Sequence, residues 1–217
     1  MRFAAEVTEF SSYLATMDSV LASAIEEYGA EHVGVQTMMF DEMVVMVTQT
    51  IDYPNTRKVV WMGTESSGRS QRMLDDADGL QADLGMFSSL MTPAKSWKWT
   101  KLEEDYFNVV AQPASFYTAA DYDAAWCLAL SAIEAGSVYA HDIAPLWPEV
   151  PRNFWGASGW VDLDDNGDRK PGIFDIWGFT RDGTGFTTYG QYNGIELVVN
   201  WDDATLAANG WTRPAAG

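Results

Sequence analysis

The sequence predicts an α/β protein with a three-layer α-β-α arrangement and a mainly parallel sheet. Its 217 residues allow one domain or two small ones, and a hydrophobic content of 47% indicates a folded chain with a core. Short apolar runs of strand length alternate with longer stretches in which apolar residues recur at helical spacing. This alternation is typical of βαβ units, whose right-handed crossovers are expected to place helices on both faces of the sheet.

The first half of the chain contains the expected parallel strands and their connecting helices. A helix is predicted from Phe10 to Tyr28, because apolar residues recur every three or four positions and Gly29 can end it. Asp41 can open a second helix, which Pro54 prevents from continuing. The strands are expected at 32–37, 58–62 and 84–90, with a third helix at 68–77.

The character of the chain changes near residue 112, which suggests a boundary between two lobes. Helices are predicted on either side of it, at 97–110, 117–135 and 142–147. The last third is rich in Gly, Asp and aromatic residues, a composition typical of strands joined by turns. These strands are expected at 159–163, 173–180, 186–189 and 196–200.

The charge of the chain excludes several classes of partner. Lys and Arg number 13 against 31 Asp and Glu, so the formal net charge is −18. A protein that binds nucleic acid needs a basic face, and an anionic membrane surface repels such a chain, so neither partner is expected. No uncharged apolar run approaches the roughly 18 residues of a membrane-spanning helix, and the N-terminus lacks the pattern of a signal peptide.

The sequence lacks the usual signatures of catalysis and of cofactor binding. It contains no GxGxxG, no Walker A loop, no HExxH and no GxSxG, and its two histidines leave little material for a triad. Paired carboxylates are expected by chance among 31 acids, so a glycosidase has no specific support. Cys127 stands alone in a helical apolar stretch, which predicts a buried, inert thiol. The protein is not expected to be an enzyme or to need a cofactor.

One acidic loop is a weak candidate for a metal site. Oxygen-bearing side chains occupy alternate positions of this loop, as at the start of an EF-hand: Asp162, Asp164, Asn166 and Asp168. The match fails at position 12, where Ile173 replaces the bidentate Glu, and no helix is predicted on either side. Asn166-Gly167 is a strong hairpin signal, so a turn is preferred to a calcium site.

A second loop follows an apolar strand and precedes a helix. In a parallel sheet this is the carboxyl end of a strand, where ligands bind, and small residues there let a ligand approach the backbone. Glu65 is the only charged residue between Gly63 and Gly68. It is a candidate ligand-binding group, and the alternative is a solvated loop acid or a helix cap.

Several segments together resemble the second half of type I periplasmic binding proteins, the Leu/Ile/Val-binding class of solute receptors. The similar segments are Val7–Leu14, Phe40–Met43, Trp61–Glu65, Tyr122–Ala124 at the start of a long helix, and the hairpin Gly156–Asp168. Their order and spacing carry the resemblance, which spans roughly residues 7–180.

The resemblance implies a set of ligand-binding residues. An acid at the place of Glu65 pairs with the α-ammonium group of an amino-acid ligand in such proteins. Met39 and Phe40 occupy the loop that supplies an aromatic contact, and Phe40 offers a ring face. Thr64 and Ser66 flank the acid in its turn. The candidate site is therefore Glu65, Phe40, Met39, Thr64 and Ser66.

The resemblance also implies an organisation of the chain. Residues 1–111 correspond to the distal ligand-binding lobe, 112–155 to helices that belong to the first lobe, and 156–217 to return strands and C-terminal hairpins. Nothing before Met1 corresponds to most of the first lobe, so the chain resembles a truncated receptor. The apolar helix 117–135 would then lack its usual partner, which predicts a homodimer of the fragment.

The function implied is that of the solute-binding component of an ABC importer for amino acids, outside the cytoplasm. Such a receptor closes over a small solute and docks on a permease. The alternative is the extracellular ligand-sensing domain of a signalling receptor, which uses the same fold.

Overall fold

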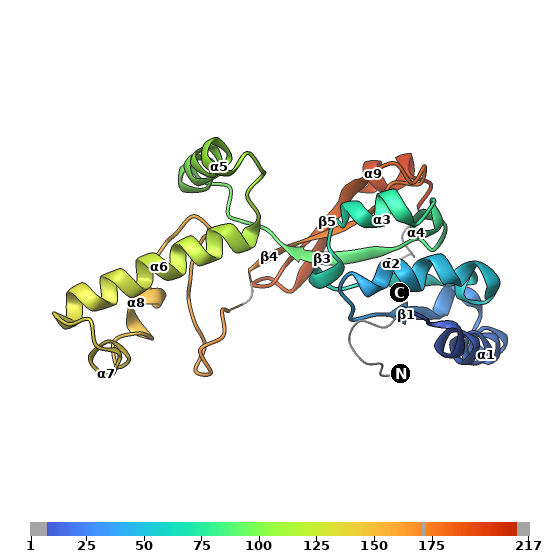
Figure 1. Ribbon diagram of the computed structural model, residues 1–217, viewed down its shortest axis with the longest axis horizontal. Helices are drawn as coiled ribbons and strands as arrows, with labels where there is room; N and C mark the ends of the chain where they lie inside the picture. The colour runs from blue at the N-terminus through green and yellow to red at the C-terminus, as the bar shows by residue number, and fades with distance from the viewer. Residues whose placement is uncertain (1–7, 171, 212–217) are drawn as a thin grey trace. The chain divides into compact units, whose positions relative to one another are not determined.

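The computed structural model describes residues 8–170 and 172–211 (Figure 1). The chain folds into two compact units. The first comprises Met1–Leu90, Phe174–Tyr192 and Val198–Gly217, and the second Met91–Ile173 and Asn193–Leu197. The second unit thus begins at residue 91, upstream of the change in composition near residue 112.

A six-stranded sheet runs through the first unit in the order β1-β2-β3-β4-β5-β6. Its strands are β1 (Gly34–Gln36), β2 (Val60–Met62), β3 (Phe87–Met91), β4 (Ile173–Phe179), β5 (Phe186–Asn193) and β6 (Val198–Trp201). The pairs β1–β2 and β2–β3 are parallel, with Val35 opposite Trp61 and Met62 opposite Phe87. The predicted parallel arrangement of segments 32–37, 58–62 and 84–90 is therefore confirmed.

The last three strands make the sheet a mixed one. Thr92 N donates to Ile173 O at 3.1 Å and Phe179 N donates to Met86 O at 3.3 Å, so β4 runs against β3. Thr180 N donates to Gly185 O where β4 turns back into β5. The predicted strands 173–180, 186–189 and 196–200 are thus confirmed, but the prediction for 159–163 is wrong. That segment forms only the single bridges Trp155↔Trp160 and Leu163↔Arg169, because tight turns on both sides leave no run of residues to pair.

One face of the sheet carries the helices α1 (Ser11–Tyr28), α2 (Glu42–Gln49) and α3 (Gln71–Asp76). Their buried side chains share one core with Val35, Trp61 and Trp177. The topology explains the placement of α2 and α3, because each lies in a connection between consecutive parallel strands and right-handed crossovers in one direction fall on the same face. The sequence predicts helices on both faces, and these two crossover helices lie on one. On the opposite face Val60 remains 40% exposed and Val199 37%.

The remaining elements are shorter. In the first unit they are η1 (Ala30–His32), η2 (Thr50–Asp52), η3 (Thr56–Lys58), η4 (Glu65–Ser67), α4 (Leu80–Asp83) and α9 (Asp203–Ala208). In the second unit the helices are α5 (Trp97–Val110), α6 (Phe116–Ala135), α7 (Ala140–Ile143) and α8 (Glu149–Arg152). Among the described residues, each helix is too short or too polar to cross a membrane.

Helix α6 matches the predicted helix 117–135 to within one residue. Ser115 caps its N-terminus in a capping box with Thr118, and Gly136 ends it in a left-handed conformation with φ 61°. Cys127 is buried, as predicted. Several large apolar side chains of the same helix stay exposed, among them Trp126 and Leu128, and Ile133 at 76%. The helix therefore has an apolar surface that the described residues do not cover.

The buried thiol of Cys127 is expected to be unreactive in the folded protein. Burial, followed by the neighbouring Asp123 carboxylate, raises its pKa to about 11 from 9.0. The folded state therefore holds this proton more tightly than the unfolded state, so this group lowers stability as the pH rises above about 9. We expect no labelling by a disulfide reagent at pH 8 and one labelled thiol per chain in denaturant. Prompt labelling of the native protein would show that the helix opens locally.

Candidate functional site

The candidate site lies where β1 and β2 end at their carboxyl termini. The chain leaves β1 through residues 37–41 and leaves β2 through the turn Gly63–Gly68, whose centre is the single helical turn η4. Both loops follow parallel neighbouring strands, so they meet at one edge of the sheet, the edge at which ligands bind in parallel α/β folds. Glu65 stands three residues beyond the end of β2, at the predicted position.

Hydrogen bonds join the two loops. Ser66 Oγ donates to Met39 O at 2.9 Å, and the hydroxyls of Thr64 and Ser66 lie 2.7 Å apart. Thr37 N donates to Met62 O at 2.8 Å, which extends the β1–β2 pairing beyond the strands. Three of the five predicted site residues, Met39, Thr64 and Ser66, are thus brought together by direct contacts.

The two residues expected to offer a side chain over the ligand differ sharply. Met39 is 4% exposed and belongs to the core, so its contribution to this edge is the carbonyl that accepts from Ser66. Phe40 is 71% exposed and leaves its ring on the surface. Of these two residues, Phe40 is therefore the one whose side chain is free to cover a bound molecule. The spacing of the sequence could not separate the two, because they are adjacent.

Glu65 is exposed, and within residues 8–170 and 172–211 no ion pair or hydrogen bond engages its carboxylate. Its carbonyl oxygen does accept, from Gly68 N at 2.9 Å, and this bond closes the turn. The backbone of Glu65 is thus fixed while its charged group remains available. A carboxylate of this kind can accept a charge-assisted hydrogen bond from an ammonium group.

Two glycines make the turn that holds Glu65. A Cβ on Gly63 would lie 2.5 Å from Ser67 Oγ, and one on Gly68 would lie 2.8 Å from the carbonyl oxygen of Glu65. Both distances are shorter than van der Waals contact. A side chain at Gly63 requires the Ser67 hydroxyl to move, and one at Gly68 meets the backbone and requires the turn to open. The sequence shows only that these positions are glycines, and the close contacts with Ser67 and Glu65 that require them appear in the structure.

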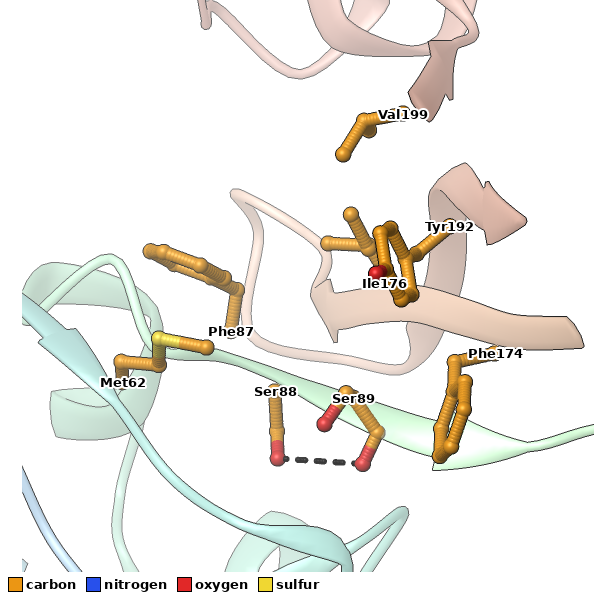
Figure 2. A pocket seen from close by; sticks show the side chains of 8 residues that line it. All are labelled: Met62, Phe87, Ser88, Ser89, Phe174, Ile176, Tyr192 and Val199. Carbon is orange, nitrogen blue, oxygen red and sulfur yellow. Dashed lines mark hydrogen bonds between the residues drawn. The ribbon is translucent and has the colours of Figure 1, made fainter. Parts of the chain in front are cut away.

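An apolar cavity of about 400 Å³ lies on the same unit, and Figure 2 shows the side chains that line it. It is lined by Met62, Phe87, Ser88, Ser89, Phe174, Ile176, Tyr192 and Val199. The rings of Phe174 and Tyr192 lie 6.2 Å apart, and the lining includes no charged side chain. Met62 immediately precedes the Glu65 turn, so polar and apolar surfaces adjoin along β2. Sequence reasoning missed these residues, although the alternation of Phe174 and Ile176 in β4 is a signal for one exposed strand face.

The acidic loop of the second unit is a hairpin turn, as predicted. Asp164 N donates to Asp168 O at 2.8 Å, and Gly167 takes a left-handed conformation with φ 85°. The Asp164 carboxylate accepts from the backbone amides of Asn166 and Asp168, which lowers its pKa. Asp162 instead pairs with Lys170 at 2.7 Å. Among the described residues no three His, Cys, Asp or Glu side chains gather as a metal site would require.

Comparison with protein families identifies one match over most of the chain. A family described as the receptor family ligand binding region matches residues 9–182. An uncharacterized protein of Methanocaldococcus jannaschii is 21% identical over 207 residues, which are 90% of this chain and 48% of that protein.

Several solved structures share the fold. A leucine-binding protein, LivK, of Thermotoga maritima has a TM-score of 0.67 at 19% identity, over 90% of this chain and 51% of that one. A solute-binding protein of an R. palustris ABC transporter, in complex with benzoate, has a TM-score of 0.62 at 13% identity, over 93% and 51%. An amino-acid ABC transporter substrate-binding protein of Pseudomonas fluorescens has 0.54 at 12%, over 97% and 53%. The predicted likeness to type I periplasmic binding proteins is confirmed, and the chain spans about half the length of these relatives.

Proposed function

We infer that this chain binds a small solute without changing it chemically, because it belongs to the family described as the receptor family ligand binding region. The observation that supports it is the edge formed by the ends of β1 and β2. There a carboxylate stands without a partner among the described residues, beside two hydroxyls and an exposed aromatic ring. These groups suit recognition of a solute by charge, hydrogen bonds and ring contact.

The solute that we propose is an amino acid. Glu65 would accept from the α-ammonium group, and Phe40 would cover the apolar part of the molecule. The Thr64 and Ser66 hydroxyls can also donate to an oxygen of the solute. Two of the similar structures support this class, because one is a leucine-binding protein and the other an amino-acid transporter component.

The proposed setting is the extracytoplasmic side of a membrane, as the receptor of an ABC importer that delivers its solute to a permease. The likeness to solute-binding proteins of ABC transporters supports it. A ligand-sensing domain of a signalling receptor is the second candidate, favoured by the description of the matching family as a receptor region. Neighbouring genes for a permease and an ATPase would favour transport over sensing.

Isothermal titration of the chain with the twenty amino acids, and with benzoate as an anionic comparison, tests the proposed solute. Saturable binding of one or a few amino acids supports it. Binding of benzoate alone would indicate that the solute is an anionic aromatic molecule and not an amino acid. If none of these compounds binds, an amino-acid site in this chain is refuted.

We also propose that the chain forms a homodimer through the exposed apolar surface of α6. Exposed patches larger than a few hundred Å² are rare on monomers, and Tyr122, Trp126 and Ile133 are exposed at positions that helical periodicity places on one side of α6. The −18 charge opposes association, but salt screens it within about 8–10 Å.

Light scattering at micromolar concentration in physiological salt is expected to give twice the chain mass of 24.0 kDa. Ile133→Gln should shift the protein toward the monomer by removing apolar contact from α6. Val20→Gln is the matched control, because Val20 is a comparably exposed apolar residue on α1. A wild-type mass of one chain, or an equal effect of both variants, would contradict the proposal.

A further inference from the structure

The residue that follows the Glu65 turn makes an unusual long-range contact. Arg69 Nη2 lies 3.3 Å from Asp175 Oδ2 in β4 and donates to Thr188 Oγ1 in β5 at 3.1 Å. We propose that Arg69 is a positioning residue, whose guanidinium holds the turn Gly63–Gly68 against β4 and β5. The inference rests on the proposed function in one respect, that Glu65 in this turn binds the solute.

The acceptors of Arg69 are themselves held in place. Asp175 Oδ1 accepts from Gln191 Nε2 at 2.9 Å, so the second oxygen of the carboxylate is left to face the guanidinium. The Asp175 side chain is only 15% exposed. A partly buried ion pair with a second hydrogen bond from the same group is stronger than an exposed pair, because water screens it less.

The backbone of Arg69 has a conformation that an arginine adopts only when other contacts stabilise it. Its φ is +48°, in the left-handed region that residues other than Gly, Asn and Asp rarely adopt. A glycine would adopt this conformation without strain. The arginine therefore needs a compensating contact, and the bonds to Asp175 and Thr188 supply one.

The contact also joins parts of the chain that are distant in sequence. Arg69 is 106 residues from Asp175 and 119 from Thr188. The start and middle of the turn are fastened to neighbouring segments, by Gly63 N to Phe87 O at 2.9 Å and by Ser66 Oγ to Met39 O at 2.9 Å. Its end is closed by bonds within the turn, from Gly68 N to Glu65 O and from Ser67 N to Thr64 O. Arg69 thus connects this end of the turn to the antiparallel half of the sheet. Losing it should let the turn move while the core beneath stays packed.

Hydrogen exchange of the amides of residues 63–68 is the direct test, and it needs no ligand. Arg69→Asn keeps a residue type that tolerates the left-handed backbone and removes the guanidinium. We expect exchange in this turn to become about tenfold faster, which corresponds to a loss of about 1.4 kcal/mol of local stability. Exchange of the core strand β2 should change little.

Two further variants make the result specific. Asp175→Asn removes the acceptor charge from the other side and should give a similar increase, and the double variant should add little to either single change. Arg57→Asn is the control, because Arg57 is a comparably exposed arginine that pairs with Asp83 at 3.0 Å, with neither partner in the turn. Unchanged exchange in Arg69→Asn, or a fully additive double variant, would overturn the positioning role. If Arg69→Asn fails to fold, Asp175→Asn with the same readout decides.

Solute titration then separates this inference from the proposed function. If the wild type binds an amino acid, Arg69→Asn should weaken binding by about five- to tenfold through loss of preorganisation, with Glu65 unchanged. Equal affinity of the two proteins would show that the turn does not need this anchor for binding. If the wild type binds no amino acid, the proposed solute fails, and the exchange data alone establish or refute the role of Arg69 in holding the turn.

Discussion

Replacing Asp123 with alanine is expected to destabilise the second unit by about 3–5 kcal/mol. Asp123 is one of the most deeply buried side chains of the protein, at 1% exposure. Its Oδ1 accepts from Ala157 N at 2.7 Å, and its Oδ2 accepts from Ser158 N at 2.8 Å and from the Ser158 hydroxyl. Alanine would leave these donors buried without an acceptor, and each orphaned group costs roughly 1–3 kcal/mol.

A nearby cation adds to the expected cost. Arg169 Nη1 donates to Ser158 Oγ at 2.7 Å, and the guanidinium lies over the Phe116 ring at 5.3 Å. Burial lowers the pKa of Arg169, and the negative charge of Asp123 opposes that shift. Removing Asp123 therefore leaves a half-buried cation without the negative charge that stabilises it.

Chemical unfolding monitored by tryptophan fluorescence measures this effect. Asp121→Ala is the matched control, because Asp121 is an exposed aspartate two residues earlier on the same helix. Asp123→Asn should fall between the two, since it keeps the shape of the side chain and loses its charge. Stability of Asp123→Ala within 1 kcal/mol of the control would show that the loop around Ser158 finds other acceptors.

Glu65→Gln is expected to weaken amino-acid binding by about 2–5 kcal/mol. This is the range for removing one partner of an ion pair that becomes desolvated on binding. Glutamine nearly preserves the shape of the side chain, so the loss would come from the charge. Folding should be unaffected, because the Glu65 carboxylate is exposed and the turn is closed by the backbone bond from Gly68.

Isothermal titration of both forms against the amino acid that the wild type binds is the measurement. Glu26→Gln, at an exposed glutamate on α1, removes the same charge from the chain without touching the turn, and it should bind as the wild type does. Equal affinities of Glu65→Gln and the wild type would assign the ammonium group to another acceptor. A melting temperature lowered only in Glu65→Gln would instead indicate a structural role for the carboxylate.

Local patterns in the sequence are enough to predict most of the elements. The helix 97–110 is predicted with its observed ends and 117–135 to within one residue, because apolar residues recur at helical spacing over each segment. The three parallel strands and the hairpin at Asp162–Asp168 follow from apolar runs and from the Asn-Gly turn signal. These features depend on interactions between residues a few positions apart, and a single sequence displays such interactions directly.

The candidate site is predicted only in part. The carboxyl end of β2 follows from the order of strand, glycine and helix, and Glu65 stands there. Burial, however, separates the adjacent Met39 and Phe40, and the apolar cavity along β3 to β6 combines strands from both ends of the chain. Such features depend on which face of a strand meets the core, and that is decided when the whole sheet assembles.

The sequence by itself determined the fold class, the family and the local positions of its turns and helices, because propensity, periodicity and turn chemistry act over short separations. Only the tertiary structure decided that α2 and α3 share one face, that Asp123 binds the loop at Ser158, and that Arg69 reaches Asp175. The bonds of Asp123 and Arg69 span 35 and 106 residues. No local preference encodes partners so distant, because they are selected by the burial of the sheet and the need of buried polar groups for hydrogen bonds.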